Sequence, residues 1–263
     1  MGTILVTVSE IATLQDNFEI EGTEVPEKYK SFDLNEWDDY ALEEAVQISE
    51  EEDDVEVVTV TIGPERSEET IRTALAKGAD RAIRVWDDEF ADAGLLTPES
   101  KASILEAVVA QEDPEFVLTG VQSGDDAFAA TGVTLASKLG DEWAAVVTDL
   151  ERDGDVSHVH RELEGGVDEV SDVEMPAVFT IQTGINEPRY ASLRGIRQAQ
   201  QKELAVSSLD DLGLGPDALE TPLSLTSMTE PESEGDATIW EGDADETAAE
   251  LADFLRNSGV VEG

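Results

Sequence analysis

Residues 55–85, VEVVTVTIGPERSEETIRTALAKGADRAIRV, decide the fold of this chain. The run Val55–Ile62 is rich in β-branched side chains, which favour a strand. Residues 68–77 carry apolar side chains at helical spacing, and the Gly78 that follows is a common helix stop. Arg81–Val85 is a second short apolar run. This order predicts a strand, a helix and a strand, the unit from which parallel sheets are built.

The same alternation continues on both sides of this unit. Strand-like runs occur at residues 4–8 and 115–119. Helical patterns begin after Asn35 and after Thr97-Pro98, where residues typical of helix N-termini stand, and a third spans residues 125–139. Alternating strands and helices predict an α/β fold built on a doubly wound, mostly parallel sheet.

The loops at one edge of that sheet are the first candidates for a ligand site. Ligands bind outside the carboxyl ends of the strands, so we expect the loops after Val8, Ile62 and Thr119 to meet. The third loop, residues 120–126 (GVQSGDD), precedes a predicted helix whose free amides favour a phosphate. Its acids could equally cap that helix, and the residues alone leave both interpretations open. The loop has neither the G-x-G-x-x-G nor the G-x-x-x-x-G-K-[ST] pattern.

The pattern changes in the second half of the chain. Three runs are typical of strands, at 144–150, 156–161 and 177–181. Asp153-Gly154 indicates a hairpin between the first two. Residues 207–245 are rich in Pro, Gly, Ser and acids, which predicts an extended linker. Residues 246–256 then predict an amphipathic helix, whose apolar stripe must be buried against its own domain or a partner.

The charge balance is extreme. The 263 residues include 62 acidic and 16 basic side chains, which gives a formal net charge of −46. So strong a negative field repels nucleic acid and anionic membrane surfaces, and both are excluded as partners. Because 40% of the residues are hydrophobic, the chain is not a disordered acidic protein. We interpret the acids as a salt-adapted surface of an extreme halophile, whose self-repulsion is screened at molar salt, where the Debye length is ~3 Å.

Several classes of site and location are disfavoured by what the sequence lacks. Without cysteine there is no disulfide, thiolate metal site or thiol nucleophile. The N-terminus has no basic region before its short apolar run, and no apolar run approaches the ~20 residues of a membrane span. We therefore expect a cytoplasmic protein with no direct membrane insertion. His158 and His160 alternate along a predicted strand, where a solvated face is favoured over a metal site.

A small cluster of contact residues stands at 186–193, NEPRYASL. Arg189 and Tyr190 are residue types that anchor interfaces. Pro188 restricts its own backbone and biases Glu187 away from helix, so the segment should be extended. On its own the cluster could be a partner-binding segment or an ordinary loop.

Two neighbouring segments narrow that choice. RELEGGVDE at 161–169 precedes the cluster, and RGIRQA at 194–199 follows it. This order and spacing resemble the β subunit of electron transfer flavoproteins, here of a halophilic, haloarchaeal type. Outside these segments a weaker similarity extends over the whole chain. The resemblance implies an adenine nucleotide α hydrolase-like fold.

The resemblance also implies a division of the chain. Residues 1–206 would form the α/β nucleotide-binding domain, with a recognition loop at about 183–199. Residues 207–245 would be the linker, and residues 246–263 a helical arm that contacts the α subunit of a heterodimer.

Two cofactors follow from the resemblance. FAD would be held mainly by the α subunit and approached by Trp37, which could instead be a core residue of its helix. AMP would lie in this subunit. The positions that match the family's cofactor-binding pattern are Thr7, Asn35, Trp37, Asp38, Ile62, Gly120, Gln122, Ser123, Gly124, Asp125, Thr131 and Gly132. Ala129, Ala130 and Ser9-Glu10 depart from that pattern, because polar or basic residues are usual there.

The recognition loop would dock the electron donors. The leucine matching Leu193 inserts into a pocket of the partner dehydrogenase, and Arg194 and Arg197 could steer an acidic partner. The full set of implied docking residues is Glu187, Pro188, Arg189, Tyr190, Leu193, Arg194 and Arg197.

The implied function is electron carriage without bond-making chemistry of its own. Electrons would pass from acyl-CoA or other flavin dehydrogenases through the flavin towards a membrane quinone oxidoreductase. One alternative is an electron-bifurcating β subunit, with a second FAD in place of AMP and NADH as a donor. A free-standing adenine-nucleotide-binding regulator is an alternative of another class, and a catalytic α/β enzyme is disfavoured because no convincing nucleophile or metal set stands out.

Overall fold

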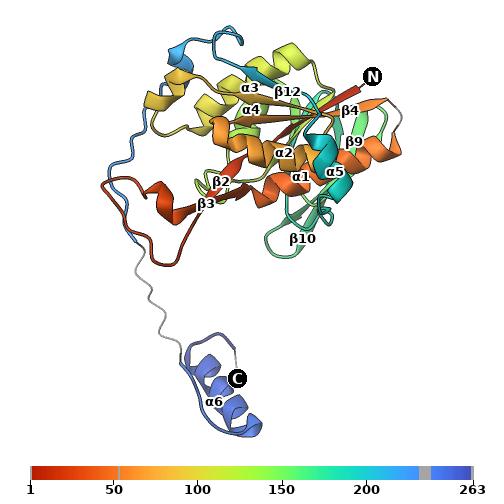
Figure 1. Cartoon of the computed structure of the whole chain (residues 1–263). Helices are drawn as coiled ribbons and strands as arrows, with labels where there is room; N and C mark the ends of the chain where they lie inside the picture. Colours follow the sequence, from red (N-terminus) through yellow and green to blue (C-terminus); the bar gives the residue numbers. More distant parts are fainter. Residues whose placement is uncertain (1, 53, 231–237, 262–263) are drawn as a thin grey trace. The chain divides into compact units, whose positions relative to one another are not determined.

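The computed structural model describes residues 2–52, 54–230 and 238–261. The chain forms two compact units, Met1–Met228 and Thr229–Gly263. The first is built on a seven-stranded sheet of order β12-β5-β4-β1-β6-β11-β7, in which neighbouring strands run parallel (Figure 1). Its strands are β1 (Gly2–Thr7), β4 (Val55–Ile62), β5 (Arg81–Val85), β6 (Phe116–Gly120), β7 (Glu142–Val147), β11 (Ala177–Ile181) and β12 (Leu204–Ser207).

Helices cover both faces of the sheet, which confirms the predicted doubly wound α/β fold. One face carries α1 (Glu36–Glu51), α2 (Glu68–Lys77) and α5 (Leu193–Ala199). The other carries α3 (Pro98–Glu112) and α4 (Thr131–Leu139). Successive side chains of a strand point to opposite faces, so the sheet separates two hydrophobic clusters. In β1, Ile4 and Val6 belong to the first cluster and Leu5 to the second.

The β-α-β unit predicted from residues 55–85 is confirmed with its bounds. β4 and β5 pair in parallel register, with Val58 opposite Arg81. Gly78 ends α2 at a φ of +145°, where a side chain would be strained. A Cβ at this position would also lie 2.7 Å from the side chain of Val46 in α1. The glycine therefore both stops the helix and lets α1 and α2 approach.

Two small antiparallel sheets accompany the main one. β2 (Glu10–Leu14) pairs with β3 (Lys30–Leu34), and β8 (Asp149–Asp153), β9 (Val156–Leu163) and β10 (Val167–Glu174) form the other. The hairpin expected at Asp153-Gly154 joins β8 to β9. The prediction of a single strand over residues 144–150 is wrong, because the chain leaves β7 after Val147 and begins β8 in the second sheet. Val146, at a φ of +61°, marks the irregularity.

The segment after β12 packs on the domain for a further stretch. Leu209, Leu212 and Leu219 are buried in the cluster beneath α3, although they lie within the predicted linker of residues 207–245. These three buried leucines pack an acidic segment on the domain, which its composition does not indicate.

The short 3-10 turns in the described residues are η1 (Glu27–Tyr29), η2 (Glu65–Ser67), η3 (Asp88–Asp92) and η4 (Pro216–Leu219).

The second unit contains α6 (Ala244–Asn257), close to the predicted helix at 246–256. Asp243 caps its N-terminus and forms a capping box with Glu246. Trp240 packs edge-on against Phe254 at a centroid distance of 5.5 Å. Residues 231–237 of the predicted linker and 262–263 of the predicted arm lie outside the described residues. None of the described helices is long and apolar enough to cross a membrane.

Candidate functional site

A cavity of about 400 Å³ opens where the loops after β1, β4 and β6 meet. The chain leaves β1 towards β4 on one side, and later returns through α3 to β6 on the other side. Strand order therefore reverses between β1 and β6, and the cavity lies at that switch point, where doubly wound sheets bind ligands. The expectation that the loops after Val8, Ile62 and Thr119 meet is confirmed, since all three residues line the cavity or its wall.

Most of the residues proposed for nucleotide binding surround this cavity. Its lining includes Thr7, Asn35, Asp38, Ile62, Gly120, Gln122, Ser123, Asp125 and Thr131. Trp37, Gly124 and Gly132 do not belong to that lining. Apolar side chains that sequence reasoning did not single out complete the wall, namely Trp86, Leu95, Leu96 and Leu105. Trp86 follows β5, Leu95 and Leu96 precede α3, and Leu105 lies in α3. Nothing in their spacing distinguished them from core residues.

Two side chains at the start of α1 hold the loops together. The buried Asp38 accepts a hydrogen bond from the amide of Ser9 at 2.7 Å and from the amide of Gly120 at 3.0 Å. Asn35 donates to the carbonyl of Gln122 at 2.9 Å and accepts from the amide of Gly124 at 3.2 Å. Asn35 occupies the predicted N-cap position, but its side chain serves the loop after β6 instead of the helix.

Burial changes the acidity of Asp38. Its side chain is taken out of water, which raises the pKa to about 6, against the opposing effect of the hydrogen bonds from Ser9 and Asn35. Gly120 is confined by the same contact, because a Cβ there would lie 2.6 Å from Oδ1 of Asp38 and 2.6 Å from Cβ of Trp37. The loop after β6 is therefore seated directly on α1.

The helix predicted over residues 125–139 begins later, at Thr131, so this prediction is corrected. Ala127 and Ala129 both have a φ of +51°, a left-handed conformation that interrupts a helix. Asp126 accepts from the amide of Phe128 at 3.1 Å, which stabilises the turn. Asp125 and Asp126 therefore lie in a loop before α4 and do not cap it. Ala130 stands at the N-cap with no polar side-chain atom, which leaves the first amides of α4 free for another acceptor.

Both basic residues in the cavity lining have an acidic partner. Lys101 on α3 pairs with Asp126. Arg66 pairs with Glu10 at 3.0 Å and lies over the ring of Phe32. Glu10, one of the residues that depart from the family pattern, thereby ties the start of β2 to η2, and it also accepts from Ser67 at 3.1 Å.

Trp37 lies at the carboxyl end of β11, outside the cavity lining. Its side chain is half-buried, unlike the fully buried Ala41 and Ala45 of the same helical stripe. Its Nε1 donates to Oε1 of Gln182 at 3.1 Å, and that oxygen also accepts from the amide of Thr183 at 3.0 Å. Trp37 thus combines a helical core position with a directed contact at the edge of the domain.

The two histidines of β9 have separate surroundings. Nδ1 of His158 lies 2.6 Å from Oδ1 of Asp172 on β10, and this hydrogen bond raises the pKa of His158. His160 pairs in register with Asp149 and Val170. Within the described ranges, no group of three or more His, Asp or Glu side chains is arranged to hold a metal ion.

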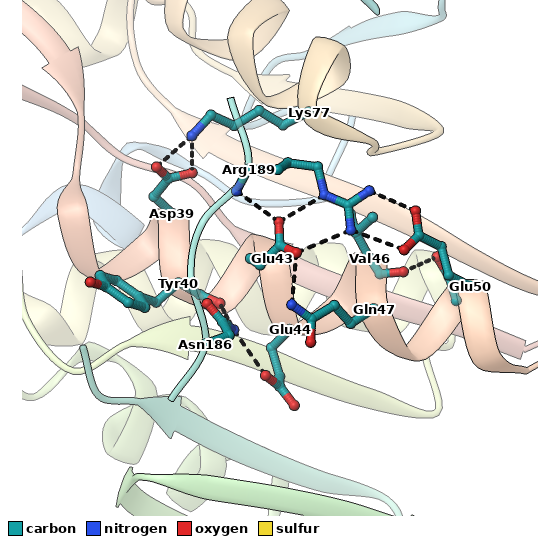
Figure 2. Close-up of polar contacts among 11 residues, drawn as sticks. Asp39, Tyr40, Glu43, Glu44, Val46, Gln47, Glu50, Lys77, Asn186 and Arg189 are labelled. Carbon is teal, nitrogen blue, oxygen red and sulfur yellow. Dashed lines mark hydrogen bonds and ion pairs between the residues drawn. The ribbon is translucent and has the colours of Figure 1, made fainter. Parts of the chain in front are cut away.

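The segment from Asn186 to Arg189 crosses α1 (Figure 2). Asn186 donates to the carbonyl of Tyr40 at 3.1 Å and to Glu44 at 2.9 Å. Arg189 donates from its backbone amide to Glu43 at 3.1 Å, and from its guanidinium to Glu43 and to a further α1 acid, Glu50. These three glutamates were not identified from the sequence, because 62 acidic residues give no local sign of which ones are paired.

The residues after Arg189 turn outward. Tyr190 is 96% exposed and Leu193 is 80% exposed. Arg194 and Arg197 are exposed too, and in the described part of the chain neither has a carboxylate within 4 Å. Of the remaining docking candidates, Glu187 is exposed and Pro188 is half-buried. Leu193 is therefore not the buried leucine that an ordinary loop end would carry.

Comparison with known proteins identifies relatives along the whole chain. A model of the electron transfer flavoprotein domain matches residues 24–212. The electron transfer flavoprotein subunit beta of Methylophilus methylotrophus is 47% identical over 262 residues, covering 96% of this chain and 97% of the relative. The subunit beta of Bradyrhizobium diazoefficiens is 37% identical, covering 87% and 86%. That of Bos taurus is 36% identical, covering 75% and 76%.

Proposed function

Because this chain belongs to the electron transfer flavoprotein family as a β subunit, we propose that it pairs with an α subunit in a heterodimeric electron carrier. The observation that carries the proposal is the match over nearly the whole chain to a β subunit of similar length. Electrons would come from acyl-CoA or other flavin dehydrogenases and leave towards a membrane quinone oxidoreductase. FAD supplies the electron chemistry, and the protein contributes position and electrostatics.

An AMP in this subunit is supported by the cavity at the switch point. Its volume of about 400 Å³ lies at the lower end of ordinary ligand sites, which favours a mononucleotide over a dinucleotide. The apolar side chains of Ile62, Trp86 and Leu96 suit a base, and the uncapped start of α4 at Thr131 suits a phosphate. Asp38 and Asn35 would keep the loops in place around the nucleotide.

The site for FAD would lie mainly on the α subunit. Trp37 would reach it from this chain, because its half-buried ring stands at the carboxyl end of β11. α6 presents a partly exposed apolar stripe that includes Leu251 and Phe254, and we propose that this arm packs on the α subunit. The linker that leads to this arm would begin after Leu219 and not at residue 207, since the chain packs on its own domain as far as Leu219.

Docking of dehydrogenases is assigned to residues 187–197. The exposed Tyr190 and Leu193 offer aromatic and apolar contact area of the kind that dominates binding energy. Arg194 and Arg197 add local positive charge to a chain of net charge −46. We also propose a salt-rich cytoplasm as the working environment, because the acidic surface needs screening.

Nucleotide analysis of the purified heterodimer tests this function. The complex would be isolated at high salt, denatured, and its nucleotides separated and identified by mass. One AMP and one FAD per heterodimer are expected. Two FAD and no AMP would place the protein in the electron-bifurcating branch. A colourless protein that purifies without an α subunit would contradict the carrier function and favour the free-standing regulator.

A further inference from the structure

We infer that Arg189 is a positioning residue, which fixes the shape of the docking segment and leaves the partner contact to Tyr190 and Leu193. This inference rests on the proposed docking function of residues 187–197. It changes the role expected for Arg189, which the family resemblance placed among the residues that contact the dehydrogenase.

Two glutamates of α1 accept from four of the five N–H groups of the guanidinium (Figure 2). Nε donates to Oε2 of Glu43 at 2.8 Å, and Nη2 donates to Oε1 of Glu43 at 3.0 Å. Nη1 and Nη2 donate to the two oxygens of Glu50 at 2.6 and 3.0 Å. The side chain therefore forms a two-pronged contact with each carboxylate, the geometry in which arginine binds carboxylates most strongly. A partner carboxylate would have to displace one of them to form a two-pronged contact of its own.

The contact also reaches the backbone of the segment. The amide of Arg189 donates to Glu43 at 3.1 Å, so one carboxylate holds both the main chain and the side chain. The Glu43 side chain is only 7% exposed, which keeps it away from any docking partner. Although burial acts in the opposite direction, the hydrogen bonds from Arg189 keep the pKa of Glu43 below its usual value, so the carboxylate stays charged.

A second attachment holds the other end of the segment. Ser192 caps α5 by accepting from the amide of Gly195 at 3.0 Å. Gly195 lies so close to α2 that a Cβ there would be 2.3 Å from the carbonyl oxygen of Ala76. Tyr190 and Leu193 thus stand close to two attachment points, one on α1 and one on α2. Such a segment has little freedom to lose on binding, which favours association.

Direct contact and positioning predict opposite effects of removing Glu50. If Arg189 bound the dehydrogenase itself, Glu50→Gln would free the guanidinium, and docking would be unchanged or stronger. If Arg189 positions the segment, the same substitution loosens it and weakens docking. Glu50 suits the test because its side chain is 59% exposed and its hydrogen bonds go to Arg189, so the variant should fold.

The experiment uses the intact heterodimer with an acyl-CoA dehydrogenase and its acyl-CoA substrate as electron donor. Wild type, Glu50→Gln and Arg189→Gln would be compared with Arg81→Gln. Arg81 is a matched control, because it too is held by two glutamates, Glu56 and Glu112, but joins β5 to β4 and α3. Two quantities are measured: KM and kcat for flavin reduction, and hydrogen exchange of the peptide covering residues 186–194.

Glu50→Gln and Arg189→Gln are both expected to speed exchange in that peptide and to raise KM. If only about a tenth of the molecules keep the docking shape, KM rises about 10-fold while kcat stays the same. Arg81→Gln should change neither quantity. An unchanged or lower KM for Glu50→Gln would overturn the positioning role. If wild type is not reduced at all, or if Leu193→Ala leaves KM unchanged, the docking function itself fails and the inference falls with it.

Discussion

The amide of Gly120 donates to Oδ1 of Asp38 at 3.0 Å, across a sequence separation of 82 residues. The other carboxylate oxygen accepts from the amide of Ser9. One buried side chain on α1 therefore joins the loops after β1 and β6, which are the two sides of the proposed nucleotide site.

Asp38 should give stability a specific pH dependence. Its pKa in the folded protein is about 6, above the 3.8 of an ordinary aspartate, so between these values the folded state binds more protons than the unfolded state. Ionisation therefore lowers the free energy of unfolding as pH rises through that window, by about 3 kcal/mol in total. The measurement is the difference in unfolding free energy between wild type and Asp38→Asn from pH 4 to 7 at molar salt. The unfolding free energy of wild type minus that of Asp38→Asn should fall as pH rises. If this difference does not change with pH, Asp38 titrates normally.

Gly120 should tolerate no side chain. A Cβ there would meet Asp38 and Trp37, including the backbone nitrogen of Asp38 at 2.9 Å, so the loop must shift. We expect Gly120→Ala to destabilise the domain by about 1–3 kcal/mol and to reduce bound AMP. Gly124→Ala is the control in the same loop, because its Cβ would meet the end of the flexible Ile11 side chain at 3.1 Å and Oδ1 of Asn35 at an ordinary 3.9 Å. Equal free energies of unfolding for Gly120→Ala and Gly124→Ala in chemical denaturation would refute the prediction that Gly120 tolerates no side chain.

The ion pair of Lys101 and Asp126 should limit nucleotide affinity. Asp126→Asn removes a negative charge from the cavity lining and frees the ammonium of Lys101 for a phosphate. We expect AMP to bind roughly fivefold more tightly to the stripped heterodimer, equivalent to about 1 kcal/mol. Titration calorimetry at fixed salt measures this change. Asp125→Asn removes the same charge from a residue that accepts from Ser123, and its effect should be smaller.

Leu193 should matter for docking and little for stability. Because its side chain is 80% exposed, Leu193→Ala should change the free energy of unfolding by less than about 0.5 kcal/mol. KM for flavin reduction by a dehydrogenase should rise by about 10-fold if Leu193 is the central contact. Leu225→Ala, at another exposed leucine of the same unit, should leave KM as in wild type. An unchanged KM in the Leu193 variant would rule out the anchor role.

Salt should stabilise the protein by screening its charge. At net charge −46 the folded chain repels itself, and this repulsion is relieved as the Debye length falls from about 10 Å at 0.1 M to about 3 Å at 1 M salt. Thermal unfolding in KCl should therefore show a Tm that climbs steeply up to about 1 M and levels off beyond it. A Tm that is independent of KCl would contradict the interpretation of the acids as salt adaptation.

Local patterns predicted the parts of the fold that one segment determines by itself. The unit of β4, α2 and β5 was predicted with its bounds because β-branched side chains, helical spacing and Gly78 all act within a few residues. The same approach missed β10, whose sequence VDEVSDVE is acidic and whose outer face is exposed, so its apolar pattern is weak. It also began α4 too early, because the left-handed turn at Ala127 and Ala129 carries no glycine signal.

By itself, the sequence determined the α/β class, the acidic surface, the meeting of three loops and the family, since each follows from composition, periodicity or a long motif. Only the tertiary structure decided how the acids are paired. The family resemblance marked Asp38 as a cofactor-binding position but not its contacts, and Glu43 and Glu50 look like any other carboxylate in the chain. The contacts of all three arise because folding brings α1 beside Gly120 and Arg189. The physical reason is that pairing and desolvation depend on distances between residues far apart in the chain, which no local pattern encodes.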